Sequence, residues 1–279
     1  MPTLFLVATP IGNLADITLR ALDTLRGVSL IAAEDTRTAR KLLSRYDIHT
    51  PLVSYHDRNK AQRIPYLLKE LEERDVALVS EAGTPAISDP GYELLLAALK
   101  NGVSVVPIPG PSIVLTALSV SGLPTDQFTY LGFLPRRAAA RRRLLASLAH
   151  SSRTLVAFEA PHRIQETLQD LLATLGDRPI AVCRELTKLH EEVFRGTVSQ
   201  ALAHFQQPRG EFTLVIEGAR QEAEASQSLS QPLRDAAAQE LALLRAQGLR
   251  AKEAVPIVAS STGLPRRQVY QLWLRAQKG

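Results

Sequence analysis

The feature that most constrains the fold is an alternation, over residues 1 to about 112, of short apolar runs with amphipathic segments. The apolar runs predict strands at residues 4–8, 29–33, 52–55, 76–79 and 103–108. The amphipathic segments predict helices at 17–25, 37–45, 61–74 and 91–100, the first with Asp16 as its N-cap. Short apolar strands separated by helices are typical of a parallel sheet. We therefore predict an α/β domain over residues 1–112.

The loop Ser80–Gly91 follows one of these strands directly and combines two glycines and two prolines with two carboxylates. Glycine lets another group approach the backbone, and proline fixes the shape of a loop. In open α/β sheets, ligands bind beyond the carboxyl ends of the strands. The loop thus indicates a small-molecule pocket, the alternative being a tight strand-to-helix turn without a ligand.

The rest of the chain divides into three further parts. Residues 113–219, with Ser112 placed to cap the helix 113–121, predict a second α/β domain. Its strands are expected at 127–133, 154–158, 180–185, 192–196 and 212–217, and its helices at 141–148, 163–175 and 198–205. Residues 220–232 are polar and predict a linker. Helical patterns at 233–247, 251–260 and 266–276, around the turn Ser261–Leu264, predict a small helix-turn-helix-like domain over 233–279. A bundle that only packs or dimerises is the alternative.

Composition excludes several classes of protein. The chain is 45% apolar and 22% charged, as in ordinary globular proteins. One cysteine, Cys183, rules out an internal disulfide and a cysteine-ligated zinc site, and it fits a reducing compartment. The histidines lack metal-ligand spacing, so we predict no metal. No apolar run approaches a membrane span or a signal peptide, so we expect a cytoplasmic protein.

Positive charge is concentrated in two places. Residues 233–279 contain eight Lys or Arg against three acids, which equals the whole formal net charge of +5. The second cluster consists of Arg136, Arg137, Arg141, Arg142 and Arg143. Localised positive charge indicates a polyanionic partner such as nucleic acid. The alternative for each cluster is a solvated helix face.

Four motifs occur together and in order: Thr9–Leu14, Glu34–Arg37, Ser80–Gly91 and Pro109–Ser112. With Phe158–Arg163 and Arg184–Lys188, this set strongly resembles the tetrapyrrole-methylase superfamily of S-adenosylmethionine-dependent methyltransferases, over about residues 3 to 220. The chain is most similar to the branch that acts on small-subunit ribosomal RNA. The resemblance implies a two-domain class III methyltransferase body with a parallel N-terminal sheet and a mixed second sheet, followed by the helical domain.

The same resemblance implies a function. The expected reaction is 2′-O-methylation of a cytidine ribose in 16S rRNA, with S-adenosylmethionine as cofactor. The expected partner is the rRNA or the assembled small subunit, and the expected assembly is a homodimer.

The match to the wider superfamily is imperfect. Tetrapyrrole methylases open with a Gly-Pro-Gly-Asp loop, where this chain has Pro10-Ile11-Gly12-Asn13. Their Gly-Gly-Asp-Pro loop aligns with Ala82-Gly83-Thr84-Pro85, and their Thr-Ala pair with Ser112-Ile113. These departures argue against a porphyrin or corrin substrate.

The resemblance also implies site residues. The cofactor is expected at Pro10, Ile11, Gly12, Ala82, Gly83, Thr84, Ile87, Ser112, Ile113, Glu159 and Leu186. A 2′-hydroxyl is a poor nucleophile while protonated, so a general base should help. The candidates are Glu81, Asp89 and Lys188, the lysine only if desolvation lowers its pKa; Asp35 and Arg37 also lie at a strand end. The carboxylates have an alternative role in orienting the loop.

The residues expected to contact RNA are Arg136, Arg137, Arg141, Arg142, Arg143, His162, Arg163, Arg266 and Arg267. Two other functions stay open at this point. One is a small-molecule methyltransferase of the same fold, which needs neither basic cluster. The other is a non-enzymatic nucleic-acid-binding regulator, which leaves the ordered loop motifs unexplained.

Overall fold

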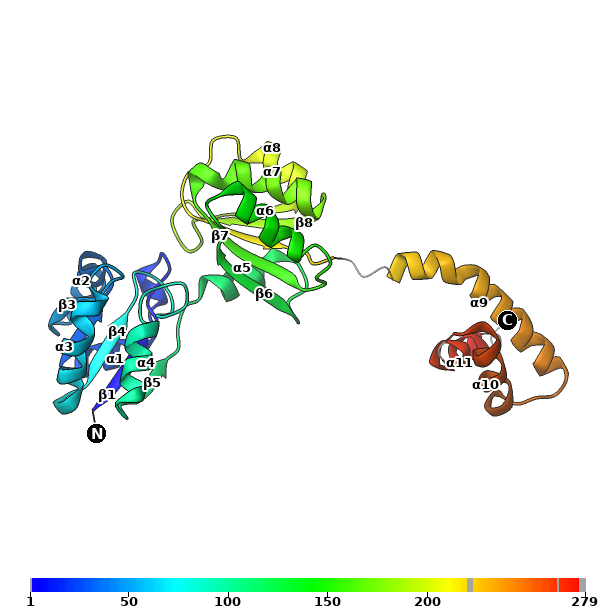
Figure 1. Ribbon diagram of the computed structural model, residues 1–279, viewed down its shortest axis with the longest axis horizontal. Helices are drawn as coiled ribbons and strands as arrows, with labels where there is room; N and C mark the ends of the chain where they lie inside the picture. Colours follow the sequence, from blue (N-terminus) through cyan, green and yellow to red (C-terminus); the bar gives the residue numbers. More distant parts are fainter. Residues whose placement is uncertain (1, 220–222, 265, 276–279) are drawn as a thin grey trace. The chain divides into compact units, whose positions relative to one another are not determined.

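The computed structural model describes residues 2–219, 223–264 and 266–275, and the chain forms two compact units (Figure 1). The first unit comprises residues 1–219 and the second comprises residues 220–279. No helix among the described residues is both long and apolar enough to cross a bilayer.

The first sheet of the larger unit contains five parallel strands in the order β3-β2-β4-β1-β5. The strands are β1 (Thr3–Val7), β2 (Leu30–Ala33), β3 (Leu52–Ser54), β4 (Val76–Val79) and β5 (Ser104–Ile108). A parallel pair needs a crossover connection, and the helices between the strands supply it. They are α1 (Leu19–Gly27), α2 (Thr36–Arg45), α3 (Lys60–Glu73) and α4 (Tyr92–Lys100), with a short 3-10 turn η1 (Leu14–Asp16) before α1. This confirms the predicted parallel sheet.

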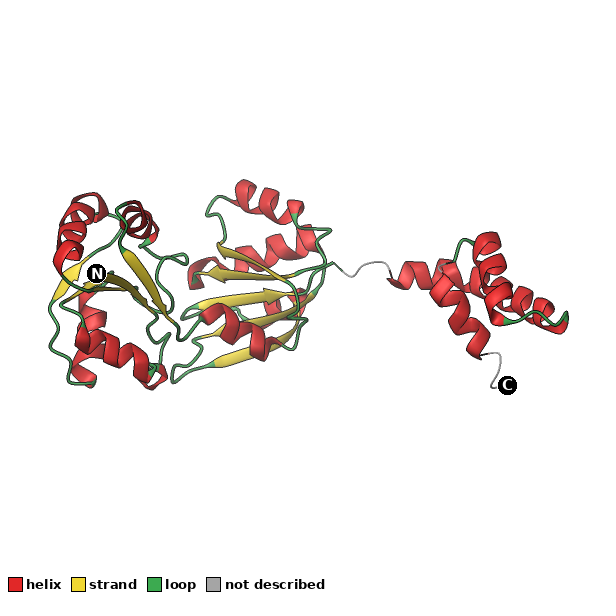
Figure 2. Ribbon diagram, turned by 90° about the horizontal axis from the view of Figure 1, so that it is seen from below, coloured by secondary structure: helices red, strands yellow, loops and turns green. Residues whose placement is uncertain are grey.

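The two faces of this sheet carry different helices (Figure 2). Val7 and Ile31 pack with buried residues of α1 and α2, such as Leu25 and Leu42. Leu4, Leu78 and their neighbours pack on the other face with α3 and α4. Successive strand residues point to opposite faces, so each strand contributes to both cores and all five carboxyl ends lie at one edge.

The second sheet is mixed, as predicted, with the order β6-β7-β10-β8-β9. Its strands are β6 (Phe128–Phe133), β7 (Thr154–Glu159), β8 (Pro179–Arg184), β9 (Glu192–Thr197) and β10 (Phe212–Ile216). Only β6 and β7 pair in parallel; the other pairs are antiparallel. Helix α5 (Ile113–Ser121) covers one face, where it packs near the buried Cys183. The other face carries α6 (Ala138–Ser147), η2 (Pro161–Arg163), α7 (Ile164–Leu175) and α8 (Val198–His204).

The second unit is a three-helix arrangement with its own core. Its helices are α9 (Ala223–Ala246), α10 (Ala251–Thr262) and α11 (Arg266–Arg275). The core contains Leu241, Val258, Val269 and Trp273. Helix α9 begins ten residues before the predicted start, so residues 223–232, predicted as linker, are helical. Six of these ten residues are Ala, Glu, Gln or Leu, which have high helix propensity, so a polar composition alone does not indicate a linker.

Two capping predictions have different outcomes. Helix α1 begins after Thr18, whose hydroxyl accepts a hydrogen bond from the Ala21 amide, so the prediction of Asp16 as N-cap is wrong. Asp16 lies instead in η1. Ser112 does occupy the N-cap position of α5, but its side chain makes no capping hydrogen bond.

Candidate active site

The loop Ser80–Gly91 has an unusual backbone conformation. Gly83 and Gly91 have positive φ, and so do the two non-glycine residues Ala86 (66°) and Ser88 (63°). Left-handed backbone in a residue with a Cβ costs about 1–2 kcal/mol. Gly91 has φ 142°, and an added Cβ would lie 3.2 Å from the Ala86 backbone nitrogen and 2.8 Å from Leu78 Cδ2, so this position favours glycine. Strain of this kind concentrates at functional sites.

Three loops meet at the carboxyl edge of the first sheet. Thr9, after β1, forms an antiparallel bridge with Gly83, its amide donating to the Gly83 carbonyl at 2.8 Å and its carbonyl accepting at 3.0 Å. Gly110, after β5, lies close to Ala8, since an added Cβ would be 3.1 Å from the Ala8 Cβ. The motifs after β1, β4 and β5 are thus brought together, as their positions at strand ends predict.

The second sheet contributes two contacts to these loops. The Asn13 amide donates to Thr187 Oγ1 at 3.1 Å, and a Cβ at Gly12 would lie 2.6 Å from Thr187 Oγ1 and 3.0 Å from the Leu186 carbonyl oxygen. Tyr130, on β6, lies 2.6 Å from Ser88, hydroxyl to hydroxyl. The loops are therefore held between the two sheets.

Asp89 is the most perturbed carboxyl group of the loop. Its pKa is raised to about 7, mainly by burial and also by the nearby Glu34 and Glu81 carboxylates, while a hydrogen bond from Ser80 opposes the shift. Burial also raises the pKa of Glu34, although the Glu81 amide donates to Glu34 Oε2 at 3.1 Å. A carboxyl with a pKa near neutrality can accept a proton and release it again at physiological pH.

Lys188 is not poised to act as a base. Burial would lower its pKa, but hydrogen bonds to Glu211 and Glu185 outweigh burial and raise it. The Lys188 ammonium lies 2.9 Å from Glu211 and 3.0 Å from Glu185. The condition under which Lys188 would act as a base, a lowered pKa, is not met here, because its partners stabilise the charged form.

Two residues expected beside the cofactor have internal partners instead. The Glu159 side chain is fully buried and accepts hydrogen bonds from Arg163, Thr167 and the Ala160 amide. Leu186 is 4% exposed and packs in the core beneath α5. The Glu159 carboxylate therefore has its observed partners within the second sheet, the Leu186 carbonyl lies close to Gly12, and their contact with the cofactor stays a prediction.

Comparison with known proteins places this arrangement in a family. The family described as Tetrapyrrole (Corrin/Porphyrin) Methylases matches residues 3–202, and one described as RsmI C-terminal HTH domain matches residues 231–278. The chain belongs to the tetrapyrrole methylase family. This confirms the resemblance read from the motifs and the predicted fold class.

Relatives of this methylase match it over nearly its whole length. A protein named Ribosomal RNA small subunit methyltransferase I from Synechocystis sp. is 50% identical, covering 99% of this chain and 99% of that protein. The protein of the same name from Halalkalibacterium halodurans is 47% identical, covering 97% and 94%. The one from Thermotoga maritima is 51% identical over 221 residues, which is 78% of this chain and 99% of that protein.

Two solved structures share the fold. A cobalt precorrin-4 methyltransferase has a TM-score of 0.59 at 18% identity, covering 76% of this chain and 94% of that one. Diphthine synthase has a TM-score of 0.63 at 16% identity, covering 77% and 90%. At these identities the likeness concerns architecture and not substrate.

The residues at the three loops of this methylase fit S-adenosylmethionine. The Thr9 hydroxyl is buried at the loop junction and has no hydrogen-bond partner among the described residues. Ala82 and Thr84 are exposed, Ile87 is 54% exposed, and the Ser112 hydroxyl is not used in capping. Unpaired polar groups beside exposed apolar side chains are what a cofactor with polar and aromatic parts requires. Pro10, Ile11, Gly12 and Gly83 belong to the same loops, and Ile113 begins α5 directly after the third of them.

The arginines predicted to contact RNA fall into two groups. Arg136, Arg137, Arg142, Arg143 and Arg266 are exposed, as is His162. Arg141 is 1% exposed and lies 2.6 Å from Asp170, and Arg163 donates to Glu159 and to the carbonyls of Leu134 and Pro135. Arg141 and Arg163 are therefore structural, and we leave them out of the RNA surface. The Arg267 side chain lies outside the described residues.

Sequence reasoning missed two residues at this site. Glu34 was overlooked as a site residue, although it follows a predicted strand directly and the strand-end rule that selected Ser80–Gly91 applies equally to it. Tyr130 reaches Ser88 because β6 has an irregular register between Tyr130 and Phe133, with Gly132 at φ 63°. An alternating strand pattern gives no signal for such a bulge.

Proposed function

We propose that the chain transfers a methyl group from S-adenosylmethionine to the 2′-hydroxyl of a cytidine in 16S ribosomal RNA. The observation that carries the proposal is the near full-length identity to proteins named Ribosomal RNA small subunit methyltransferase I. The chain is a methyltransferase, and S-adenosylmethionine is its methyl donor. The rRNA or the assembled small subunit is the proposed substrate, in the cytoplasm, with a homodimer as the proposed assembly.

The loops after β1, β4 and β5 are the proposed cofactor site. Bound there, S-adenosylmethionine supplies an electrophilic methyl group on a sulfonium that leaves readily. Holding a nucleophile and an electrophile in the right geometry can account for much of the rate. The main work of the protein is therefore positioning, and the Thr9–Gly83 bridge and the Ser88–Tyr130 hydrogen bond fix the loops for it.

Asp89 is the proposed general base, and it takes the proton of the 2′-hydroxyl. With a pKa of about 7, roughly half of the Asp89 carboxyl groups are ionised at neutral pH. Glu34 keeps that pKa high through its charge. Glu81, which is exposed and anchors its amide on Glu34, is the second candidate.

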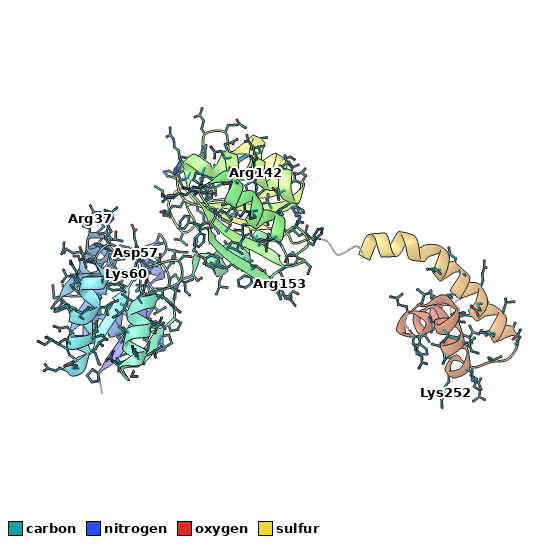
Figure 3. The ribbon with its side chains drawn as sticks, viewed as in Figure 1. Arg37, Asp57, Lys60, Arg142, Arg153 and Lys252 are labelled. Atoms are coloured by element: carbon teal, nitrogen blue, oxygen red, sulfur yellow. The ribbon has the colours of Figure 1, made fainter. Side chains whose placement is uncertain are left out.

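The exposed arginines of the second sheet and of the helical unit are the proposed RNA contacts. Arg136, Arg137, Arg142 and Arg143 lie on or just before α6, where Figure 3 labels Arg142, and Arg266 begins α11. Contacts of arginine with phosphate give affinity without reading sequence. The proposed division of the chain is a domain at 1–112, a domain at 113–219 and the basic helical domain.

The test is to incubate the protein with radiolabelled S-adenosylmethionine and either unmodified small subunits or free 16S rRNA. Label confined to one cytidine ribose supports the proposal, and the faster of the two substrates is the physiological one. If no RNA carries label although calorimetry shows that S-adenosylmethionine binds, the proposal is refuted and the search for the substrate turns to small molecules. RNA binding without any S-adenosylmethionine binding would favour a regulator.

A further inference from the structure

Every charged residue on the outer face of helix α2 is a cation. Arg37, Arg40, Lys41 and Arg45 are exposed, and α2 contains no acidic residue. Arg37, Lys41 and Arg45 are spaced at i, i+4 and i+8, so they lie on one face with Arg40 beside them. The opposite face consists of the buried Ala39, Leu42 and Leu43, which pack against the sheet. We call the four exposed residues the α2 stripe.

The α2 stripe is poorly neutralised. Arg37 pairs with Asp35 at 3.1 Å, and Arg45 lies over the Tyr46 ring. Arg40 and Lys41 form no ion pair with any of the described residues.

Helix α3, on the other face of the same sheet, provides a contrast. It carries three cations (Lys60, Arg63, Lys69) and three acids (Glu70, Glu72, Glu73). Lys60 pairs with Asp57 and Glu93. A solvated helix face normally mixes signs in this way. The one-sided charge of α2 is thus a property of that face and not of the whole domain.

The α2 stripe lies beside the candidate active site. Helix α2 follows Glu34 after one residue, and its inner residues Thr38 and Leu42 line a hollow together with Thr9, Ser80 and Glu81. Arg37 lies at the same end of the sheet as Asp57 (Figure 3). Negative charge therefore lies at the strand ends and positive charge on the neighbouring helix. This arrangement should attract phosphates to α2 and repel them from the loop.

The Thermotoga maritima relative indicates that the catalytic unit needs a binding surface of its own. That protein carries the rRNA methyltransferase name, yet 99% of its length is matched by only 78% of this chain. It has no room for a counterpart of the helical unit. A protein of that size must hold its substrate with the two-sheet body.

We propose that the α2 stripe binds phosphates of the RNA strand next to the target nucleotide. This inference rests on the proposed function and adds a surface to it. Four helical residues rise about 6 Å, comparable to the separation of neighbouring phosphates along a strand, so cations at i, i+4 and i+8 can each meet one phosphate. The partner is an RNA backbone, recognised by charge and not by base sequence.

The test replaces both unpaired cations by glutamine, which keeps helix propensity while removing charge. The variant is Arg40→Gln with Lys41→Gln, and the matched control is Lys69→Gln with Lys100→Gln, exposed on the helices of the opposite face. Binding of 16S rRNA is measured over a series of salt concentrations. Log affinity falls as log salt rises, and the magnitude of this negative slope should decrease by about 0.7 to 0.9 for each phosphate that the protein no longer neutralises, so by up to about 1.8. The S-adenosylmethionine affinity should not change.

Three other results are possible, and each of them contradicts either this inference or the proposed function. A slope equal to that of the wild type and the control overturns the inference. Weaker binding to small subunits with unchanged binding to naked rRNA assigns the α2 stripe to a ribosomal protein and also overturns it. If the wild-type protein neither binds nor methylates the rRNA, either free or in the small subunit, the proposed function fails instead.

Discussion

The carboxyl group of Asp89 should make stability and activity depend on pH in opposite directions. Its pKa rises from 3.8 to about 7 on folding, mainly because of burial. The folded protein therefore binds this proton more tightly than the unfolded chain. Stability is lost as the pH rises from about 4 to about 7, because ionising Asp89 is harder in the folded state. The shift of about 3 units corresponds to about 4 kcal/mol, as an upper value.

The perturbation is Asp89→Asn, assayed by urea unfolding at several pH values. Asparagine cannot ionise, so the variant does not carry the free-energy cost of ionising a buried carboxyl group. Its stability relative to wild type should increase by up to about 4 kcal/mol between pH 4 and pH 8. Other titrating groups cancel in this difference. The control is Asp126→Asn, an exposed carboxylate whose replacement should stay within about 0.5 kcal/mol at every pH.

The methylation rate should depend on pH in the opposite direction to stability. The wild-type rate should rise through a midpoint near pH 7, and Asp89→Asn should remove this limb and lower the rate by about 10²- to 10⁴-fold. Glu34→Gln should move the midpoint to lower pH, because the Glu34 charge raises the pKa of Asp89. A stability difference that is flat with pH would refute the reasoning about burial. An unchanged rate profile would remove Asp89 as the base.

Three further substitutions test the supporting structure. Asp170→Ala should cost about 3–5 kcal/mol in urea unfolding, because it removes the buried partner of the Arg141 guanidinium and leaves only the exposed Glu166 carboxylate at 3.6 Å. Gly12→Ala should weaken S-adenosylmethionine binding in calorimetry, since its Cβ would lie 3.0 Å from the Leu186 carbonyl oxygen and 2.6 Å from Thr187 Oγ1. Tyr130→Phe should cost about 1 kcal/mol of stability and lower the methylation rate at saturating RNA, because it removes the hydrogen bond that holds Ser88.

Matched control substitutions define the results that would contradict these predictions. Arg143→Ala, on the exposed side of α6, should stay near wild type in the same unfolding assay, and an equal loss would remove the argument from burial. Gly27→Ala has no atom within 4 Å of the added Cβ and should leave cofactor binding unchanged. If Tyr130→Phe behaves like wild type in both assays, the β6 contact does not position the loop.

The fold and the location of the site followed from local pattern. Strands such as β4 at Val76–Val79 were predicted with their observed bounds, because a short apolar run between a helix and a glycine-rich loop has few other solutions. The meeting of the β1, β4 and β5 loops followed from the common carboxyl edge of parallel strands. Both inferences need only residues close together in the chain.

The roles of individual charged side chains were predicted less well, for a physical reason. Arg141 has its partner 29 positions away at Asp170, and Lys188 has one 23 positions away at Glu211. Whether an arginine faces solvent or a buried carboxylate depends on which elements pack together. That information is tertiary, so a cluster of arginines in sequence predicts positive charge but not its accessibility.

The burial of Cys183 makes site-specific labelling of this chain practical. It is the only cysteine, it is 1% exposed, and burial raises the pKa of its thiol to about 11. At pH 8 only about one thiol in a thousand is then ionised, so maleimides and disulfide reagents should leave it untouched. Cysteines introduced on the surface would be the reactive thiols without prior removal of the native one. Fluorophores placed in this way, one on α2 and one on α10, would report how far apart the two compact units lie before and after RNA is added.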